Sequence, residues 1–202
     1  MKYLALDTSG DLLVMLNIDG QTYVKHLVGC QTKHSLTLMP YIEELLKENG
    51  ISLRDLDFYA VVTGPGSFTG IRIGISTIKA LCFATQKKVL SLTSFDLLAY
   101  ADNAPNKAMC VVNANHGNYY CASYENKKVK MPPCFLTKED IENYISDFIV
   151  CSISEEDFIA NFVSDVVSGL KNAVKAKIDN LQDYSEIAPL YVKRSQAEEE
   201  SC

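Results

Sequence analysis

A glycine-rich segment directly after an apolar run most constrains how this chain can fold. The apolar run covers residues 58–62, and the segment Gly64-Pro65-Gly66-Ser67-Phe68-Thr69-Gly70 follows it. A short apolar run rich in β-branched and aromatic residues is typical of a buried strand. The sequence therefore predicts a sharp turn that leads from a buried strand into a helix over about residues 69–84.

Glycines continue into that helix at a spacing of four residues. Gly66, Gly70 and Gly74 fall on one helix face. A glycine inside a helix costs about 1 kcal/mol relative to alanine, so a second backbone is expected to approach this face closely. A separate apolar stripe comprises Ile71, Ile75, Ile78 and Cys82. Two interpretations remain open: both stripes serve one core, or the glycine stripe meets a partner.

The order of predicted elements suggests two similar halves. Strands over residues 3–6, 12–16 and 22–24 precede a helix with an apolar period over 38–46 that ends at Asn49-Gly50. The strand 58–62, the glycine-rich helix, a strand over 88–92 and a helix to about 101 follow. In the second half the sequence predicts strands at 109–112, 119–124 and near 129, followed by a chain break at Pro132-Pro133. A capped helix from Thr137 to about residue 145, a strand at 148–151 and a helix over 164–181 are expected after this break. We expect an α/β protein with domains 1–103 and 104–202, the second abbreviated.

Composition excludes several classes. The 19 basic and 25 acidic residues give a net charge of −6, and no apolar run approaches the roughly 20 residues of a membrane span. Asp7 interrupts the apolar N-terminus, which therefore does not read as a signal peptide. The acidic pI of about 5.1 argues against a standalone nucleic-acid binder. Seven cysteines without a Cys-x-x-Cys pair indicate reduced thiols and a cytoplasmic protein.

Few residues point to chemistry. The glycine segment fits neither standard phosphate-loop spacing, so a structural turn is the favoured interpretation. Asp7, Thr8 and Ser9 follow the first strand and could contact a nucleotide phosphate or a metal, although such residues also form turns. The corresponding turn of the second half has Asn113-Ala114-Asn115, without a carboxylate. The three histidines form no metal-ligand spacing, and His34 is expected to be a helix cap or a surface residue.

These residues resemble the bacterial TsaB (YeaZ) family. The resemblance rests on Asp7-Thr8-Ser9, His34-Ser35 leading into Leu38-Met39-Pro40, the run from Gly64 to Gly74, and a closing Pro189-Leu190-Tyr191-Val192-Lys193-Arg194. It implies two RNase H-like lobes of the sugar kinase/Hsp70/actin superfamily. It also implies a role in making threonylcarbamoyladenosine in tRNA, as the activating partner of the paralogous transferase TsaD.

The resemblance further implies partners and an interface. TsaB proteins form homodimers, or heterodimers with TsaD, through two helices of the first lobe, and the ATPase TsaE joins the assembly. Contact with tRNA is then indirect, no cofactor is required, and ATP or ADP with Mg²⁺ is possible only at the level of the complex. The corresponding helices here cover about residues 34–49 and 69–84. The residues expected to form the interface are Leu38, Ile42, Leu45, Gly70, Ile73, Gly74, Thr77 and Leu81.

Departures from the family pattern favour a pseudo-enzyme. The helix at 34–49 lacks a second histidine, so the metal site of the paralogue is absent, and no protease constellation supports the older glycoprotease label. We therefore expect a non-catalytic subunit whose association is blocked by Gly74→Leu. The main alternative is an ATP-dependent phosphotransferase or ATPase that uses Asp7, and a metallopeptidase is the third possibility.

Overall fold

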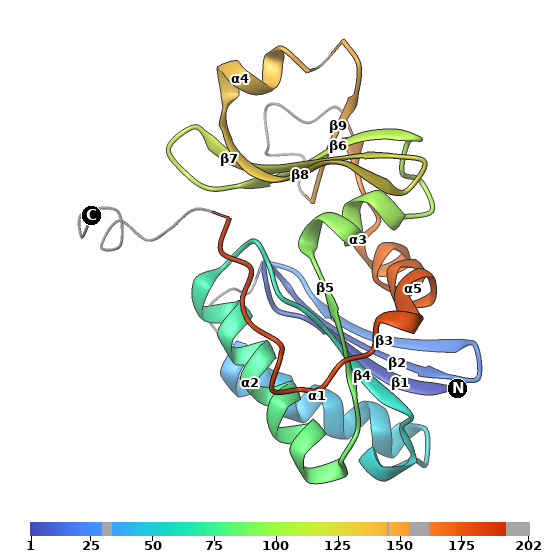
Figure 1. Ribbon diagram of the computed structural model, residues 1–202. Helices are drawn as coiled ribbons and strands as arrows, with labels where there is room; N and C mark the ends of the chain where they lie inside the picture. Colours follow the sequence, from blue (N-terminus) through green and yellow to red (C-terminus); the bar gives the residue numbers. More distant parts are fainter. Residues whose placement is uncertain (30–33, 145, 154–161, 193–202) are drawn as a thin grey trace. The chain divides into compact units, whose positions relative to one another are not determined.

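The computed structural model describes residues 1–29, 34–144, 146–153 and 162–192 (Figure 1). It divides the chain into two units, one formed by Met1–Thr93 with Val174–Pro189 and one by Ser94–Ala173 with Leu190–Cys202. The expected boundary lay between residues 103 and 104, whereas the first segment of the first unit ends at Thr93. The helix at residues 94–100 belongs to the second unit because Phe95, Leu98 and Ala99 pack in the core of that unit. Cys30, Cys202, Lys193 and Arg194 lie outside the described residues.

The first unit is a five-stranded sheet with two long helices on one face (Figure 1). Strand order is β3-β2-β1-β4-β5; the first three strands are antiparallel, and β4 and β5 are parallel to β1. The elements are β1 (Lys2–Asp7), β2 (Leu12–Ile18), β3 (Gln21–Leu27), α1 (His34–Glu48), a 3-10 helix (Leu53–Asp55), β4 (Phe58–Val62), α2 (Phe68–Thr85) and β5 (Val89–Leu92). The predicted strands, the hairpin at Asp19-Gly20 and both helices are confirmed.

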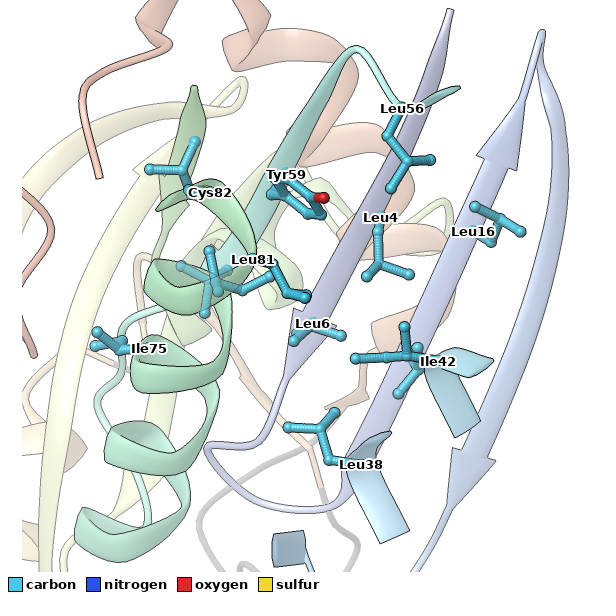
Figure 2. Packing of buried hydrophobic residues seen from close by; sticks show 14 of the residues in the cluster. Leu4, Leu6, Leu16, Leu38, Ile42, Leu56, Tyr59, Ile75, Leu81 and Cys82 are labelled. Carbon is cyan, nitrogen blue, oxygen red and sulfur yellow. The ribbon is translucent and has the colours of Figure 1, made fainter. Parts of the chain in front are cut away.

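The core of the first unit lies between the sheet and the two helices. Figure 2 shows Leu4, Leu6 and Tyr59 on the strands directed toward side chains of α1 and α2. A segment near the C-terminus completes this core, because Ile187 is buried in it and Gln182 forms an antiparallel bridge with Val89 of β5. The core therefore includes residues from both ends of the sequence.

The second unit repeats the topology of the first. Its strand order is β10-β9-β6-β7-β8, again with three antiparallel strands and two parallel to the first of them. The elements are α3 (Ser94–Tyr100), β6 (Lys107–Asn113), β7 (Asn118–Glu125), β8 (Lys128–Thr137), α4 (Lys138–Glu142), β9 (Ile149–Ser152), β10 (Phe162–Val163) and most of α5 (Val166–Lys177). The 3-10 helix that follows (Ile178–Asn180) belongs to the first unit. The sheet has all five strands, so the abbreviation lies in its helices: α4 has 5 residues and α1 has 15.

Pro132 and Pro133 do not break the chain as predicted. Both lie within β8, which is an edge strand, and the pairing with β7 shifts register where they occur, between Cys121 and Ser123. Proline lacks the N–H that a ladder needs, and a bulge at a sheet edge is where it is tolerated. None of the described helices is long and apolar enough to cross a membrane.

Candidate functional site

The turn after β1 is held together by its own side chains. The Asp7 carboxylate accepts a hydrogen bond from the backbone N–H of Ser9 at 2.8 Å, and both residues are buried. Burial raises the pKa of Asp7, partly opposed by the hydrogen bonds from Ser9. Thr8 is also buried, and its hydroxyl donates to the carbonyl oxygen of Gly70 at 2.7 Å. The three candidate nucleotide-contact residues therefore join β1 to the start of α2.

The equivalent turn of the second unit has the same geometry without a charge. Asn113 ends β6 as Asp7 ends β1, and its side-chain oxygen accepts from the N–H of Asn115 at 2.7 Å. A short side-chain oxygen that caps the amide two residues later is a common way to close such a turn. Among the described residues, no group of three or more His, Cys, Asp and Glu could hold a metal ion.

The glycine-rich segment is a structural turn into α2. Ser67 caps the helix by accepting from the N–H of Gly70 at 3.2 Å, and the Ser67 N–H donates to the Ser9 carbonyl. A methyl group at Gly66 would overlap the Ser9 backbone, and one at Gly70 would overlap the Thr8 carbonyl. The predicted close approach of a second backbone is confirmed, but that backbone belongs to the same chain.

Gly74 also allows α2 to lie close to the β1–β2 turn. A methyl group at Gly74 would overlap the Thr8 hydroxyl. Bulk at this position therefore disturbs the contact between α2 and the β1–β2 turn. The proposed variant Gly74→Leu would consequently damage the first unit itself, and it cannot serve as a test of association.

His34 is neither a cap nor a surface residue. It is the first residue of α1, is 2% exposed, and lies so close to α2 that a methyl group at Gly70 would come within 3.2 Å of its Nδ1. Its Nε2 has no hydrogen-bond partner in the part of the chain that the structure describes. Burial lowers the pKa of His34, which favours the neutral imidazole.

Most of the expected interface residues face inward. Leu38, Ile42, Leu45 and Leu81 belong to the core of the first unit, and Gly70 and Gly74 are buried against the β1–β2 turn. An amphipathic helix turns its regular apolar stripe toward its own sheet. The expectation that these six residues face a partner is therefore wrong, whereas Ile73 and Thr77 are half-buried and line a groove.

The outward side of α1 and α2 carries a different set of residues. A shallow groove of about 550 Å³ is lined by Ser35, Phe68, Thr69, Arg72, Ile73, Ser76 and Thr77. On α1, which contributes Ser35 to the groove, Leu36 is 76% exposed and Met39 is also exposed. The Arg72 guanidinium lies 3.7 Å from the centre of the Phe68 ring. We call these nine residues the outer face. Leu36 and Met39 are apolar residues between the core positions of α1, and they were the sequence signal that could have identified this face.

Comparison with known proteins shows the family. The family model for TsaD, tRNA N6-adenosine threonylcarbamoyltransferase, matches residues 29–188. Several relatives are named tRNA threonylcarbamoyladenosine biosynthesis protein TsaB. The protein of Escherichia coli (strain K12) is 27% identical over 62% of this chain and 55% of its own length. The protein of Haemophilus influenzae is 29% identical over 64% of this chain and 56% of its own length. The chain spans 55–59% of the length of the curated relatives it matches first.

A solved structure agrees in fold. YeaZ from Pseudomonas aeruginosa superposes with a TM-score of 0.79 at 21% identity, covering 94% of this chain and 99% of that one. The resemblance first drawn from the glycine-rich run is thus supported by the whole order of strands and helices. The chain belongs to the family described by the TsaD model and, within it, to the TsaB/YeaZ group.

Proposed function

We propose that this chain is a non-catalytic activating subunit in the synthesis of tRNA threonylcarbamoyladenosine, and that it binds a TsaD-type transferase through the outer face. The observation that carries the proposal is the exposure of Leu36, Met39 and Phe68 on neighbouring helices beside a groove. Contiguous exposed apolar side chains on a soluble protein commonly mark a protein-binding surface. The names of the curated relatives supply the pathway.

The non-catalytic part of the proposal rests on Asp7. Its carboxylate is buried in its own turn, and burial raises its pKa, which disfavours the ionised form that a Mg²⁺ ligand needs. Asn113 forms the same turn in the second unit without a charge. Each unit then serves as an RNase H-like lobe of the sugar kinase/Hsp70/actin superfamily that has kept the fold as a scaffold.

The proposed assembly has several members. The same surface would also pair with a second copy of the chain, because a self-complementary patch forms a two-fold dimer, so homodimer and heterodimer would compete. A TsaE-type ATPase would join the heterodimer in the cytoplasm, with ATP or ADP and Mg²⁺ bound by the complex. Contact with tRNA would be made through the complex.

Light scattering of the chain, alone and mixed with the TsaD-type protein of the same organism, tests this proposal. We expect a one-to-one complex that Leu36→Arg and Ser76→Arg each weaken at least tenfold, about 1.4 kcal/mol or more. Both residues are exposed on the outer face, so neither change should disturb the core. Val129→Arg is the matched control, because Val129 is 55% exposed on β8 of the second unit.

Two results would contradict the proposal. In the first, the chain does not associate with the TsaD-type protein; Mg²⁺-dependent nucleotide turnover that is lost in Asp7→Ala would then favour the phosphotransferase alternative. In the second, the complex forms but both outer-face variants bind as tightly as Val129→Arg, which would place the interface elsewhere.

A further inference from the structure

Four cysteines of the second sheet lie opposite one another in two register pairs. Cys110 of β6 is the partner of Cys151 on the parallel strand β9, and Cys121 of β7 is the partner of Cys134 on the antiparallel strand β8. All four thiols are free in this structure. Both pairs are register partners in one sheet, but one pair joins parallel strands and the other antiparallel strands, and the two pairs also differ in burial.

The Cys121 and Cys134 side chains lie on one face of the sheet. Both pack in the cluster between the sheet and α4. Directly opposed residues of an antiparallel pair have their Cβ atoms about 4.5–5.5 Å apart, and a disulfide needs about 3.5–4.5 Å. A shift of the order of an ångström would bring a pair at the typical separation into the Cβ–Cβ range of a disulfide.

The two pairs differ in access. Cys134 is half-buried on the edge strand, next to the exposed Pro132-Pro133 bulge, whereas Cys110 and Cys151 are buried on inner strands. Burial raises the pKa of Cys121 to about 12, with a smaller contribution from the neighbouring Cys134. Burial also raises the pKa of Cys134. Raised pKa values lower the thiolate fraction of both residues, so access decides the order: Cys134, the more accessible thiol, is the one that meets an oxidant first.

We propose that Cys121 and Cys134 form a reversible disulfide when the chain meets a small disulfide such as oxidised glutathione. The Cys134 thiolate attacks one glutathione sulfur, which breaks the glutathione S–S bond and releases one glutathione thiolate. The Cys121 thiolate then attacks the Cys134 sulfur of the mixed disulfide and expels the second glutathione. The two protein thiols lose two electrons and two protons, and oxidised glutathione becomes two reduced molecules.

The experiment treats the full folded chain with oxidised glutathione at mildly alkaline pH, alkylates the remaining thiols and maps the peptides by mass spectrometry. We expect a peptide pair that joins Cys121 to Cys134, a mass lower by two hydrogen atoms, and full reversal by a reducing agent. Cys110 and Cys151 should stay reduced and serve as an internal comparison, since both are buried and they lie across a parallel pair of strands.

Variants separate the two steps. Cys134→Ser should remove the cross-link, and Cys121→Ser should leave Cys134 as a stable mixed disulfide with glutathione. Cys134 is the safer position to change, because it is half-buried at the sheet edge. The proposal is overturned if Cys134 of the unmodified sequence accumulates only the mixed disulfide, if it stays reduced, or if Cys110 and Cys151 cross-link to the same extent.

Discussion

Asp7 and Asn113 show how one turn can be closed with or without a charge. Each residue ends the first strand of its unit, and each caps the N–H two residues later. The hydrogen bond requires only a side-chain oxygen, and both carboxylate and amide supply one. The negative charge of Asp7 is therefore unnecessary for the turn and unfavourable for stability, since burial raises its pKa.

This contrast predicts opposite outcomes for two substitutions of Asp7. Asp7→Asn keeps the acceptor and should leave the free energy of unfolding at pH 7 unchanged or higher, whereas Asp7→Ala removes it and should cost about 1–3 kcal/mol. Because the folded-state pKa is raised, ionised Asp7 costs stability above the unfolded value of about 3.9. The advantage of Asp7→Asn should therefore grow as pH rises from about 4, as measured by urea unfolding. An advantage that shrinks over this range would show that the charge stabilises the fold.

His34 illustrates the limit of prediction at single residues. Its place at the start of a helix was predicted, and its burial was not. Burial at this position follows from the approach of α2, where Gly70 leaves room for the imidazole. Contacts between residues far apart in the sequence decide such an environment, and hydrophobic periodicity does not report them.

At the scale of elements, the apolar stripe of α1 was identified correctly but assigned to the wrong neighbour. Residues 38, 42 and 45 follow the helical period, and this period shows that they share a face. It does not show whether the face meets the chain's own sheet or a partner. The structure places all three in the core of the first unit.

The two faces of α1 should therefore respond differently to truncation. Leu38 is 1% exposed, and Leu38→Ala should lower the free energy of unfolding by about 2–5 kcal/mol. Leu36→Ala, on the outer face, should change it by less than about 0.5 kcal/mol. Chemical denaturation of the isolated chain measures both. Similar losses for the two variants would mean that the outer face of α1 is covered within the chain.

β10 and the continuation of β8 beyond the strand predicted near residue 129 were missed for identifiable reasons. β10 has only two residues, too few to show any alternation. β8 contains two prolines, which usually interrupt a strand, and only its position at the sheet edge with a register shift accommodates them. In both cases the partner strand, and not the local sequence, determines the structure.

At the scale of the whole molecule, the repeated order of strands was predicted and is confirmed, whereas the division into units was not. The sequence predicted a boundary between residues 103 and 104, within the polar, proline-containing segment 102–106, but the chain leaves the first unit after residue 93 and returns at residue 174. Polar and proline-containing segments mark surface turns. They do not show which sheet a following helix packs against.

The return of the chain predicts that a residue near the C-terminus stabilises the first unit. Ile187 is buried in its core, and Ile187→Ala should speed amide hydrogen exchange in β5, where Val89 and Gln182 exchange backbone hydrogen bonds of 3.1 and 2.9 Å. Tyr191→Ala, at an exposed position, is the control. Unchanged exchange in β5 of Ile187→Ala would show that the returning segment adds nothing to this core.

The same return of the chain affects how the protein is made. A ribosome releases residues in order, and N-terminal domains generally fold first. Here the first sheet emerges early, yet Gln182 and Ile187, which complete its edge and core, emerge only after all five strands of the second sheet. The unit whose synthesis begins first is thus completed only after the second sheet has been synthesised, and until then β5 lacks its backbone pairing with Gln182.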